Sequence, residues 1–394
     1  MLINKTHLDI FLTSLRLGFI SFGGPIAHLG YFRQEYVVRK KWISEQAYAD
    51  LVGLCQFLPG PASSQVGMGI GLIRGGVLGS ILSWIGFTLP SAIILVLFGL
   101  GLTQIQLSAH QTWLHGLKVV AVAIVAQAFL GMWRKLCPDK ERAGLAIISS
   151  IIILMTNSVL AQVLVLFGSG LLGIFFLRSS QNLPHETAPI IKRSTGLFFL
   201  ILFFLLLTVL PILATVFDVQ GLRLIDSFYR AGALVFGGGH AVLPMLQAEV
   251  ISNGWVSRDL FMAGYGLANA IPGPLFAFSA YLGSVSKTQP SGLLGAFLCL
   301  SAIFLPSFLL VIGILPFWEK LRRIDKIRQA ILGLNAAIVG ILLAALYNPI
   351  WSSAIFTLKD FLLAAAGFTL LEFFHLQSWI VVFITVFLSL FIYY

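Results

Sequence analysis

Charged residues and cysteines are scarce in this sequence of 394 residues. Asp, Glu, Lys and Arg make up 10% of the chain and hydrophobic residues 58%, a balance far outside that of soluble globular domains. The cysteines Cys55, Cys137 and Cys299 form no CxxC pair, so neither a disulfide framework nor a zinc site is indicated. No GxxxxGK[ST] loop is present, which argues against an ATP-driven pump. We therefore expect no metal and no cofactor.

Long apolar runs are abundant instead. Val77 to Leu102, Gly196 to Phe217 and Gly292 to Phe317 each reach or exceed the ~20 residues that a helix needs to cross a bilayer. The formal net charge is +10, but most basic residues lie in short loops beside apolar runs, where they orient the chain rather than bind nucleic acid. The sequence predicts an all-α polytopic membrane protein.

Two halves of the chain repeat the same short motifs. Arg16 to Gly24 matches Arg230 to Gly238, and both segments contain Phe-Gly-Gly. Further along, Leu58-Pro-Gly-Pro61 matches Ile271-Pro-Gly-Pro274. Such self-similarity indicates duplication. We predict an N-terminal repeat over residues 1–178, a polar linker with one membrane helix over 179–220, and a C-terminal repeat over 221–394.

The basic residues of the two halves lie in different loops. The loop Leu102 to Thr112 contains none, whereas its counterpart Trp318 to Arg328 contains five; the next loop has basic residues in the first half, but Tyr347 to Leu358 has none. Because such residues favour the cytoplasm, corresponding loops lie on opposite sides, with Ser108 outside and Asp325 inside. This pattern predicts inverted-topology repeats with broken half-helices meeting near the membrane midplane.

Each Pro-Gly-Pro break leaves apolar legs too short to span the membrane, so we expect re-entrant hairpins. After the first break, a half-helix would present the amides of Ala62, Ser63 and Ser64 to an anion, whereas Phe276 and Ala277 occupy the matching places of Ser63 and Ser64. We predict that the first hairpin binds and the second seals, so that Ser63→Ala and Ser64→Ala impair transport more than Phe276→Ala. The alternative is that both breaks are packing kinks.

The candidate substrate-binding residues lie at or beside these breaks. They are Arg16, Gly23, Gly24, His28, Gln56, Pro59, Gly60, Pro61, Ser63 and Ser64 in the first half, and Arg230, Gly237, Gly238, His240, Asn269, Pro272, Gly273 and Pro274 in the second. The Phe-Gly-Gly segments let the backbone bend or approach closely, with small-residue helix packing as the alternative.

Arg16 and Arg230 are the preferred anion ligands, because ionisable groups in apolar membrane segments are costly. The alternatives pair them with Glu35 and Glu249 as buried bridges, or let them snorkel to the interface. The same two glutamates are candidate proton carriers, although a solvated ion pair is the alternative for Glu35.

His28 and His240 could exchange protons or donate to an oxyanion, and a hydrogen-bonded structural histidine is the alternative for each. Gln56 and Asn269 precede the breaks by the same interval and would line the cavity with neutral amides. Alternatively they bond the carbonyls that the breaks leave free.

The segments Phe22-Gly-Gly-Pro-Ile-Ala-His28, Gln56-Phe-Leu-Pro-Gly-Pro61 and Phe236-Gly-Gly-Gly-His240 resemble those of the chromate ion transporter family in its long, two-domain form. The resemblance covers essentially the whole chain. It implies export of chromate across the bacterial inner membrane, coupled to the proton-motive force. The residues themselves suit sulfate or phosphate equally. The implied partners are an oxyanion and the lipid bilayer, with no nucleic acid, and a homodimer is one assembly that we consider.

Two other classes of function compete with a carrier. An anion channel also uses broken helices. An intramembrane enzyme has little support, because Gly168-Ser169-Gly170 has no nearby histidine and no HExxH occurs. We expect no enzymatic activity.

Overall fold

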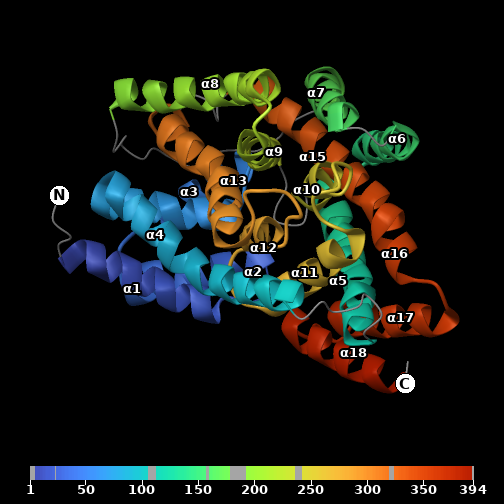
Figure 1. The fold of residues 1–394 in the computed structure, drawn as a ribbon. Helices are drawn as coiled ribbons and strands as arrows, with labels where there is room; N and C mark the ends of the chain where they lie inside the picture. The colour runs from blue at the N-terminus through green and yellow to red at the C-terminus, as the bar shows by residue number, and fades with distance from the viewer. Residues whose placement is uncertain are drawn as a thin grey trace.

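The computed structural model describes residues 5–22, 24–104, 112–156, 159–177, 192–235, 242–318 and 324–392, and in these ranges every regular element is a helix. The fold is therefore all-α, as predicted, and is built of two repeats in series (Figure 1). One long helix, α8 (Arg193–Phe217), joins them and lies at the edge of the molecule. Because α8 crosses the membrane once, the second repeat begins on the side opposite to the first.

Corresponding elements follow one another in the same order in the two repeats. The first repeat contains α1 (Lys5–Ile20), α2 (Gly24–Phe32), the π-helix η1 (Arg33–Arg39), α3 (Glu45–Phe57), α4 (Ala62–Gln104), α5 (Thr112–Leu136), α6 (Lys140–Thr156) and α7 (Val159–Phe176). The second contains α9 (Gln220–Leu234), α10 (Val242–Val250), α11 (Arg258–Ala270), η3 (Leu275–Ala277), α12 (Phe278–Ser284), α13 (Gly292–Ile314), η4 (Leu315–Phe317), α15 (Asp325–Ala345), η5 (Leu346–Trp351), α16 (Ser352–Ala354), α17 (Leu358–Glu372) and α18 (Ser378–Ile392).

Five stretches of helix in the described ranges are long and apolar enough to cross a membrane: Ala62–Leu102, His115–Leu136, Arg193–Phe217, Gly292–Phe317 and Asp325–Ala354. Only 17% of the most apolar window of α8 is buried inside the protein, against 56% or more for the other four. The exposed apolar surface of α8 therefore faces lipid. The chain is a multi-pass membrane protein.

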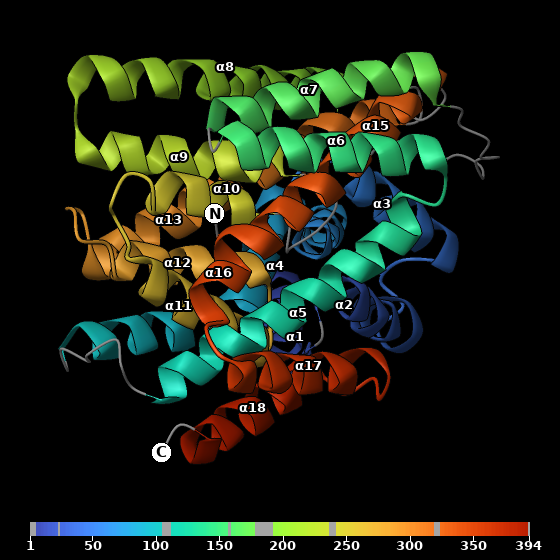
Figure 2. The same cartoon turned by 90° about the vertical axis from the view of Figure 1, so that its right-hand side faces the viewer.

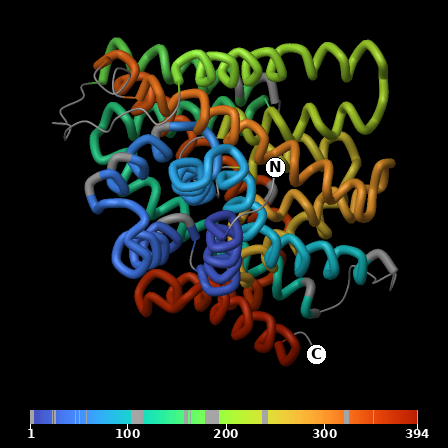
Figure 3. The backbone as a smooth tube through the Cα atoms, turned by 90° about the vertical axis from the view of Figure 1, so that its left-hand side faces the viewer, coloured from blue at the N-terminus to red at the C-terminus, as the bar shows by residue number. Residues whose placement is uncertain are grey.

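The repeats exchange their last helices. Helix α5 of the first repeat packs against α17 and α18 of the second, and α15 of the second packs against α6 and α7 of the first. In Figure 2, α6, α7 and α8 lie along the top and α17 and α18 along the bottom, with α5 and α15 passing between them. Figure 3 shows the blue segments of the first repeat between α8 above and the red C-terminal helices below. Neither repeat is an independent bundle.

Each Pro-Gly-Pro break forms the tip of a hairpin. In the first repeat the ends of the two legs meet where the Arg74 guanidinium lies 4.5 Å from the centre of the Trp42 ring. In the second, the amide of Lys287 donates to the carbonyl of Trp255 at 2.8 Å. The predicted re-entrant hairpins are therefore present in both repeats, with both ends of each hairpin on one side of the membrane.

Helix α4 contains a reversal that separates the hairpin leg from the crossing helix. Gly75 and Gly76 depart from helical geometry, and Gly76 has a φ of +65° that favours glycine. The two parts touch closely, because a Cβ on Gly79 would lie 2.3 Å from the carbonyl oxygen of Gly71. Only the part after Gly76 crosses the membrane.

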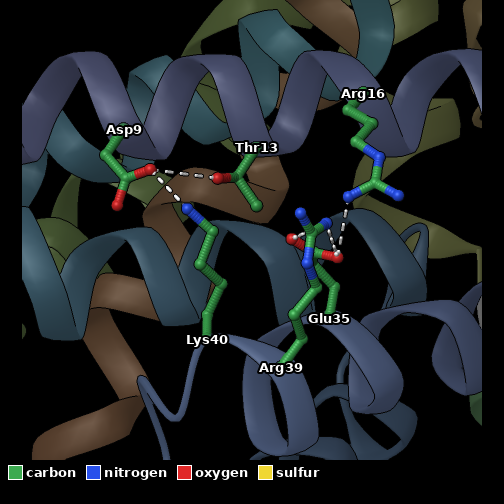
Figure 4. A network of polar contacts seen from close by, with 6 residues as sticks. All are labelled: Asp9, Thr13, Arg16, Glu35, Arg39 and Lys40. Carbon is green, nitrogen blue, oxygen red and sulfur yellow. Dashed lines mark hydrogen bonds and ion pairs between the residues drawn. The ribbon is translucent and has the colours of Figure 1, made fainter.

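The first Phe-Gly-Gly segment also lies at a hairpin tip. Helix α1 ends at Ile20, α2 begins at Gly24, and η1 then runs back beside α1. Two ion pairs hold the legs antiparallel: Asp9 with Lys40 at 2.6 Å and Arg16 with Glu35 at 3.4 Å (Figure 4). The chain therefore does more than bend at this segment; it reverses.

Candidate functional site

The hairpin tips of the two repeats are hydrogen-bonded to each other in a crossed arrangement. The amide of Gly60, in the first Pro-Gly-Pro, donates to the carbonyl of Val235 at 2.6 Å, directly before the second Phe-Gly-Gly. The amide of Gly273, in the second Pro-Gly-Pro, donates to the carbonyl of Ser21 at 3.0 Å, directly before the first. Each broken segment of one repeat thus satisfies a backbone carbonyl that the break in the other repeat leaves free.

Both tips require glycine. Gly60 and Gly273 have φ values of +114° and +103°, in the range that side chains disfavour. A Cβ at Gly60 would lie 2.6 Å from the Oγ of Ser307, and one at Gly273 would lie 2.7 Å from the Oγ of Ser91. Ser91 and Ser307 follow matching prolines on α4 and α13. The crossing therefore has approximate two-fold symmetry in its packing as well as in its hydrogen bonds.

A cavity of about 420 Å³ lies at this crossing, within the size range of small-ligand sites. Six predicted site residues line it: Gly24, His28, Gln56, Gly60, Asn269 and Gly273. Ala62 and Leu275, the first residues after the two breaks, also line it. Both hairpins thus contribute their tip glycine, their amide side chain and the start of their second leg to one space.

The cavity extends toward the side that carries the basic loops, which is the cytoplasmic side by the distribution of charge. Lys135 and Leu136 at the end of α5, Glu372 at the end of α17 and Ser378 at the start of α18 line this part. Glu372 is paired with Arg134 at 2.5 Å. Lys135 is exposed and forms no ion pair with another described residue.

Neutral polar groups line the deeper part. Gln56 is exposed, Asn269 donates from Nδ2 to the carbonyl of Tyr265 at 2.8 Å, and Asn335 on α15 lies on the cavity wall. Amide groups of this kind donate hydrogen bonds to an oxyanion without adding a charge that would have to be desolvated.

His28 connects the cavity wall to the first half-helix. Its ring is buried, lies edge-on to Phe87 with centroids 5.4 Å apart, and has Nδ1 3.2 Å from the Oγ of Ser63. Ser63 therefore does not line the cavity itself but contacts His28, which does. Ser64 is also buried, and its Oγ has no hydrogen-bond partner among the described residues.

The two predicted arginine ligands do not line the cavity; they are ion-paired. Arg16 bonds Glu35, which also accepts from Arg39 at 3.0 Å (Figure 4). Arg230 bonds Glu249 at 3.0 Å. These are the pairs that the sequence offered as the alternative. Glu35 and Glu249 are both buried, but the side chains of Arg16 and Arg39 are 53% and 55% exposed, against 26% for Arg230, so only the second pair is buried on both sides.

The remaining predicted residues support the breaks or lie outside the described ranges. Pro59 accepts a hydrogen bond from Nε2 of Gln65 at 2.6 Å, while Pro61, Pro272 and Pro274 complete the breaks without lining the cavity. The residues outside the described ranges are Gly23, Gly237, Gly238 and His240.

Sequence reasoning missed Lys135, Gln127 and Asn335 as cavity residues. A signal for Asn335 was present, because it occupies the place in α15 that Lys118 occupies in α5 when Gly116 is matched with Gly333. Lys118 itself is buried and forms an ion pair with Asp259 on α11 at 2.6 Å. Over the described ranges, no three His, Cys, Asp or Glu residues are grouped as metal ligands.

Comparison with known proteins agrees with this architecture. A family model described as Chromate transporter matches the chain twice, over residues 8–174 and 222–390. The chain therefore belongs to the chromate transporter family.

Relatives in this family match most of the chain. A "Probable chromate transport protein" of Synechococcus elongatus is 28% identical over 84% of this chain and 81% of its own length. A "Chromate transport protein" of Pseudomonas aeruginosa is 27% identical over 86% and 79%, and another of Cupriavidus metallidurans is 26% identical over 84% and 79%. No solved structure matches the chain. The resemblance read from the sequence is confirmed, and the chain is a member of a transporter family.

Proposed function

We propose that this member of the family is a secondary active transporter that exports chromate, or a similar tetrahedral oxyanion such as sulfate, across the cytoplasmic membrane at the expense of the proton-motive force. One observation carries this proposal: a cavity with several polar side chains in its wall, open toward the basic loops, lies where the broken segments of both inverted repeats cross. Inverted-repeat transporters bind their substrates at such a place. The names of the relatives supply chromate as the oxyanion.

In the proposed cycle the oxyanion enters past Lys135 and is held by neutral donors. Gln56, Asn269 and Asn335 provide amide N–H groups, and the first half-helix, which begins at Ala62, directs its positive dipole end toward the same space. His28, held by Ser63, completes the wall. These donors neutralise part of the charge without binding so tightly that release is prevented.

The outer side of the pathway is closed in this structure by α5 and α11, where Lys118 is bonded to Asp259. Asn335, the counterpart of Lys118 in the other repeat, lines the cytoplasmic cavity instead. We propose that the two repeats exchange these conformations during transport, as in other inverted-repeat carriers. Lys118 then leaves Asp259 and lines an outward-facing cavity. The predicted homodimer is not needed for this cycle and stays a prediction.

Uptake of labelled chromate into inverted membrane vesicles tests the proposal. The cytoplasmic face of these vesicles is outside, so export appears as uptake. We expect saturable uptake that an acidic vesicle interior stimulates, that a protonophore abolishes and that sulfate inhibits by competition. Vesicles from cells lacking the protein are the control. Uptake that neither saturates nor responds to the proton gradient would instead identify a channel.

A further inference from the structure

The matched arginines of the two repeats, Arg16 and Arg230, lie in clusters of opposite formal charge. In the first repeat, Glu35 is bonded by two arginines, Arg16 and Arg39. In the second, Arg230 is bonded by two carboxylates, Asp226 and Glu249. The first cluster has a formal charge of +1 and the second a formal charge of −1 when all its members are ionised. The same Arg–Glu pair is thus placed in two electrostatic settings.

The sequence accounts for the difference. When Arg16 is matched with Arg230, Asp226 takes the place of Leu12, and Asn253 takes the place of Arg39. The side chain of Asn253 no longer touches the glutamate side chain; its Nδ2 donates to the backbone carbonyl of Glu249 at 2.7 Å. One substitution adds an acid and the other removes a base.

The guanidinium of Arg230 makes more contacts with Asp226 than with Glu249. Asp226 accepts from Nε at 3.0 Å with each of its oxygens, and its Oδ2 also accepts from Nη2 at 2.8 Å. Glu249 receives one contact, from Nη1 to Oε1 at 3.0 Å, and its Oε2 accepts from the hydroxyl of Ser227 at 2.7 Å. Both acid side chains are less than a tenth exposed.

This geometry determines which acid takes a proton. Two ionised carboxylates around one guanidinium leave a negative charge buried, which is costly. Protonation of Asp226 would lose a bidentate ion pair. Protonation of Glu249 at Oε2 gives up one single contact's charge but leaves the hydrogen bond from Arg230 to Oε1 in place, because the Ser227 hydroxyl can turn from donor to acceptor. Glu249 is therefore the acid that can exist in both states within the same packing.

The helices packed against α9 and α10 carry few other charged residues. Helices α7 and α15 also pack against α10; α7 contains no charged residue, and α15 contains none after Arg328. Helix α13, packed against α9, contains none, and the charge at the start of α8, Arg193, lies at the end away from the loop that leads into α9. On α9 itself, Arg223 is paired with Asp218. His240 lies outside the described residues.

The acid pair is connected to the substrate cavity through one helix. Asp226 and Arg230 lie on α9, which ends at Leu234, and the next carbonyl, that of Val235, accepts the hydrogen bond from Gly60 at the tip of the first hairpin. A change in how α9 is held against α10 therefore acts directly on a residue that lines the cavity. Such a connection is what coupling between an ion site and a substrate site requires.

We propose that Glu249, with Asp226 as its partner across Arg230, is the proton-binding site of the transporter. This rests on the proposed proton-coupled function. Glu249 takes one proton from the extracytoplasmic side, becoming a neutral acid hydrogen-bonded to Ser227, and releases it toward the cytoplasm when chromate moves outward. Glu35, bonded by two arginines, has a structural part.

The test compares Glu249→Gln with its counterpart Glu35→Gln in inverted vesicles, by two assays. The first is accumulation driven by an acidic interior; the second is counterflow, in which labelled chromate exchanges for unlabelled chromate with no gradient. For Glu249→Gln we expect driven accumulation to fall at least 10-fold while counterflow stays within about 2-fold of wild type. For Glu35→Gln we expect driven accumulation and counterflow to change together, or not at all.

Asp226→Asn gives a second measurement that does not depend on Glu249→Gln folding. Without Asp226, a proton on Glu249 no longer neutralises a buried excess of negative charge around Arg230, so driven accumulation should fall in this variant while counterflow is kept. Driven accumulation that survives in Glu249→Gln, or that is unchanged in Asp226→Asn, would overturn the assignment. If the wild-type protein itself shows counterflow but no response to a proton gradient, the proposed coupling fails instead.

Discussion

Replacing Gly60 by alanine tests whether the crossing of the hairpins organises the transport site. The backbone there has a φ of +114°, and a side chain held in so sparsely populated a conformation costs about 1 to 3 kcal/mol. The new Cβ would also lie 2.6 Å from the Oγ of Ser307 and 2.7 Å from the Nε2 of Gln65. Both neighbours are fully buried, and Gln65 is held by the carbonyl of Pro59. Neither side chain can therefore move away from the new Cβ without a cost in free energy.

The displacement follows from these distances. To reach an ordinary contact of 3.4 Å from the Oγ of Ser307, the hairpin tip would have to move by about 0.8 Å. That shift stretches the hydrogen bond from Gly60 to Val235, now 2.6 Å, and displaces the cavity wall. Overpacking of this kind adds roughly 1 to 3 kcal/mol, so the total is about 2 to 6 kcal/mol. A misplacement near 1 Å at a site can lower a rate by about 100-fold.

The assay separates stability from transport. We expect Gly60→Ala in detergent to unfold at lower temperature than wild type, and chromate uptake per folded molecule to fall by at least 10-fold. Adding Ser307→Ala removes one of the two close atoms, so the double variant should recover part of the stability but not the cost of the backbone conformation. Gly53→Ala, on the first leg of the same hairpin, is the matched control, because its Cβ meets no atom within 4 Å. Wild-type transport by Gly60→Ala would refute the reasoning.

Three further predictions follow from the same geometry. A cleavable thiol-reactive cross-linker between cysteines replacing Lys118 and Asp259, whose side chains now bond at 2.6 Å, should stop uptake, and cleaving the linker should restore it. Uptake unaffected by the cross-link would contradict the alternating cycle. Leucine at Gln56 should raise the KM for chromate about 10- to 150-fold, which corresponds to about 1.5 to 3 kcal/mol for a hydrogen bond to a charge. Leucine at Asn269 should raise it somewhat less, since that amide also bonds Tyr265; an unchanged KM in both variants would remove these residues from the site. Ser63→Ala should lower uptake more than Phe276→Ala, the matching substitution in the second hairpin. The reverse order would indicate that the second hairpin binds the substrate.

Features with a local cause could be predicted from the sequence. Pro59, Gly60 and Pro61 break a helix wherever they occur, and the short legs on either side leave only a hairpin. The pairing of Arg16 with Glu35 was also within reach, since both lie beside the same break. Inversion of the repeats could be predicted from the distribution of basic residues among the loops, because such residues favour the cytoplasmic side of the membrane whatever the fold.

Contacts between the repeats could not be predicted in the same way. Gly60 meets Val235, and Lys118 meets Asp259, across more than a hundred residues of chain. Nothing in the sequence near Lys118 indicates that it is buried and paired. Repeat symmetry was the available signal: once one crossing is known, the matched motifs supply the second.

Departures from that symmetry bear on the direction of transport. The cytoplasmic mouth presents Lys135, whereas Lys118, near the outer end of the same helix, is neutralised by Asp259. A unit charge ~10 Å from a dianion contributes roughly 1 kcal/mol in water and about 3 kcal/mol near a protein surface, enough to favour entry from the cytoplasm by about 5- to 150-fold. If Lys135 attracts the anion over a distance, Lys135→Gln should weaken chromate uptake from the cytoplasmic face most at low ionic strength, because salt screens an exposed charge. An equal loss at all salt concentrations would show that Lys135 acts by contact instead.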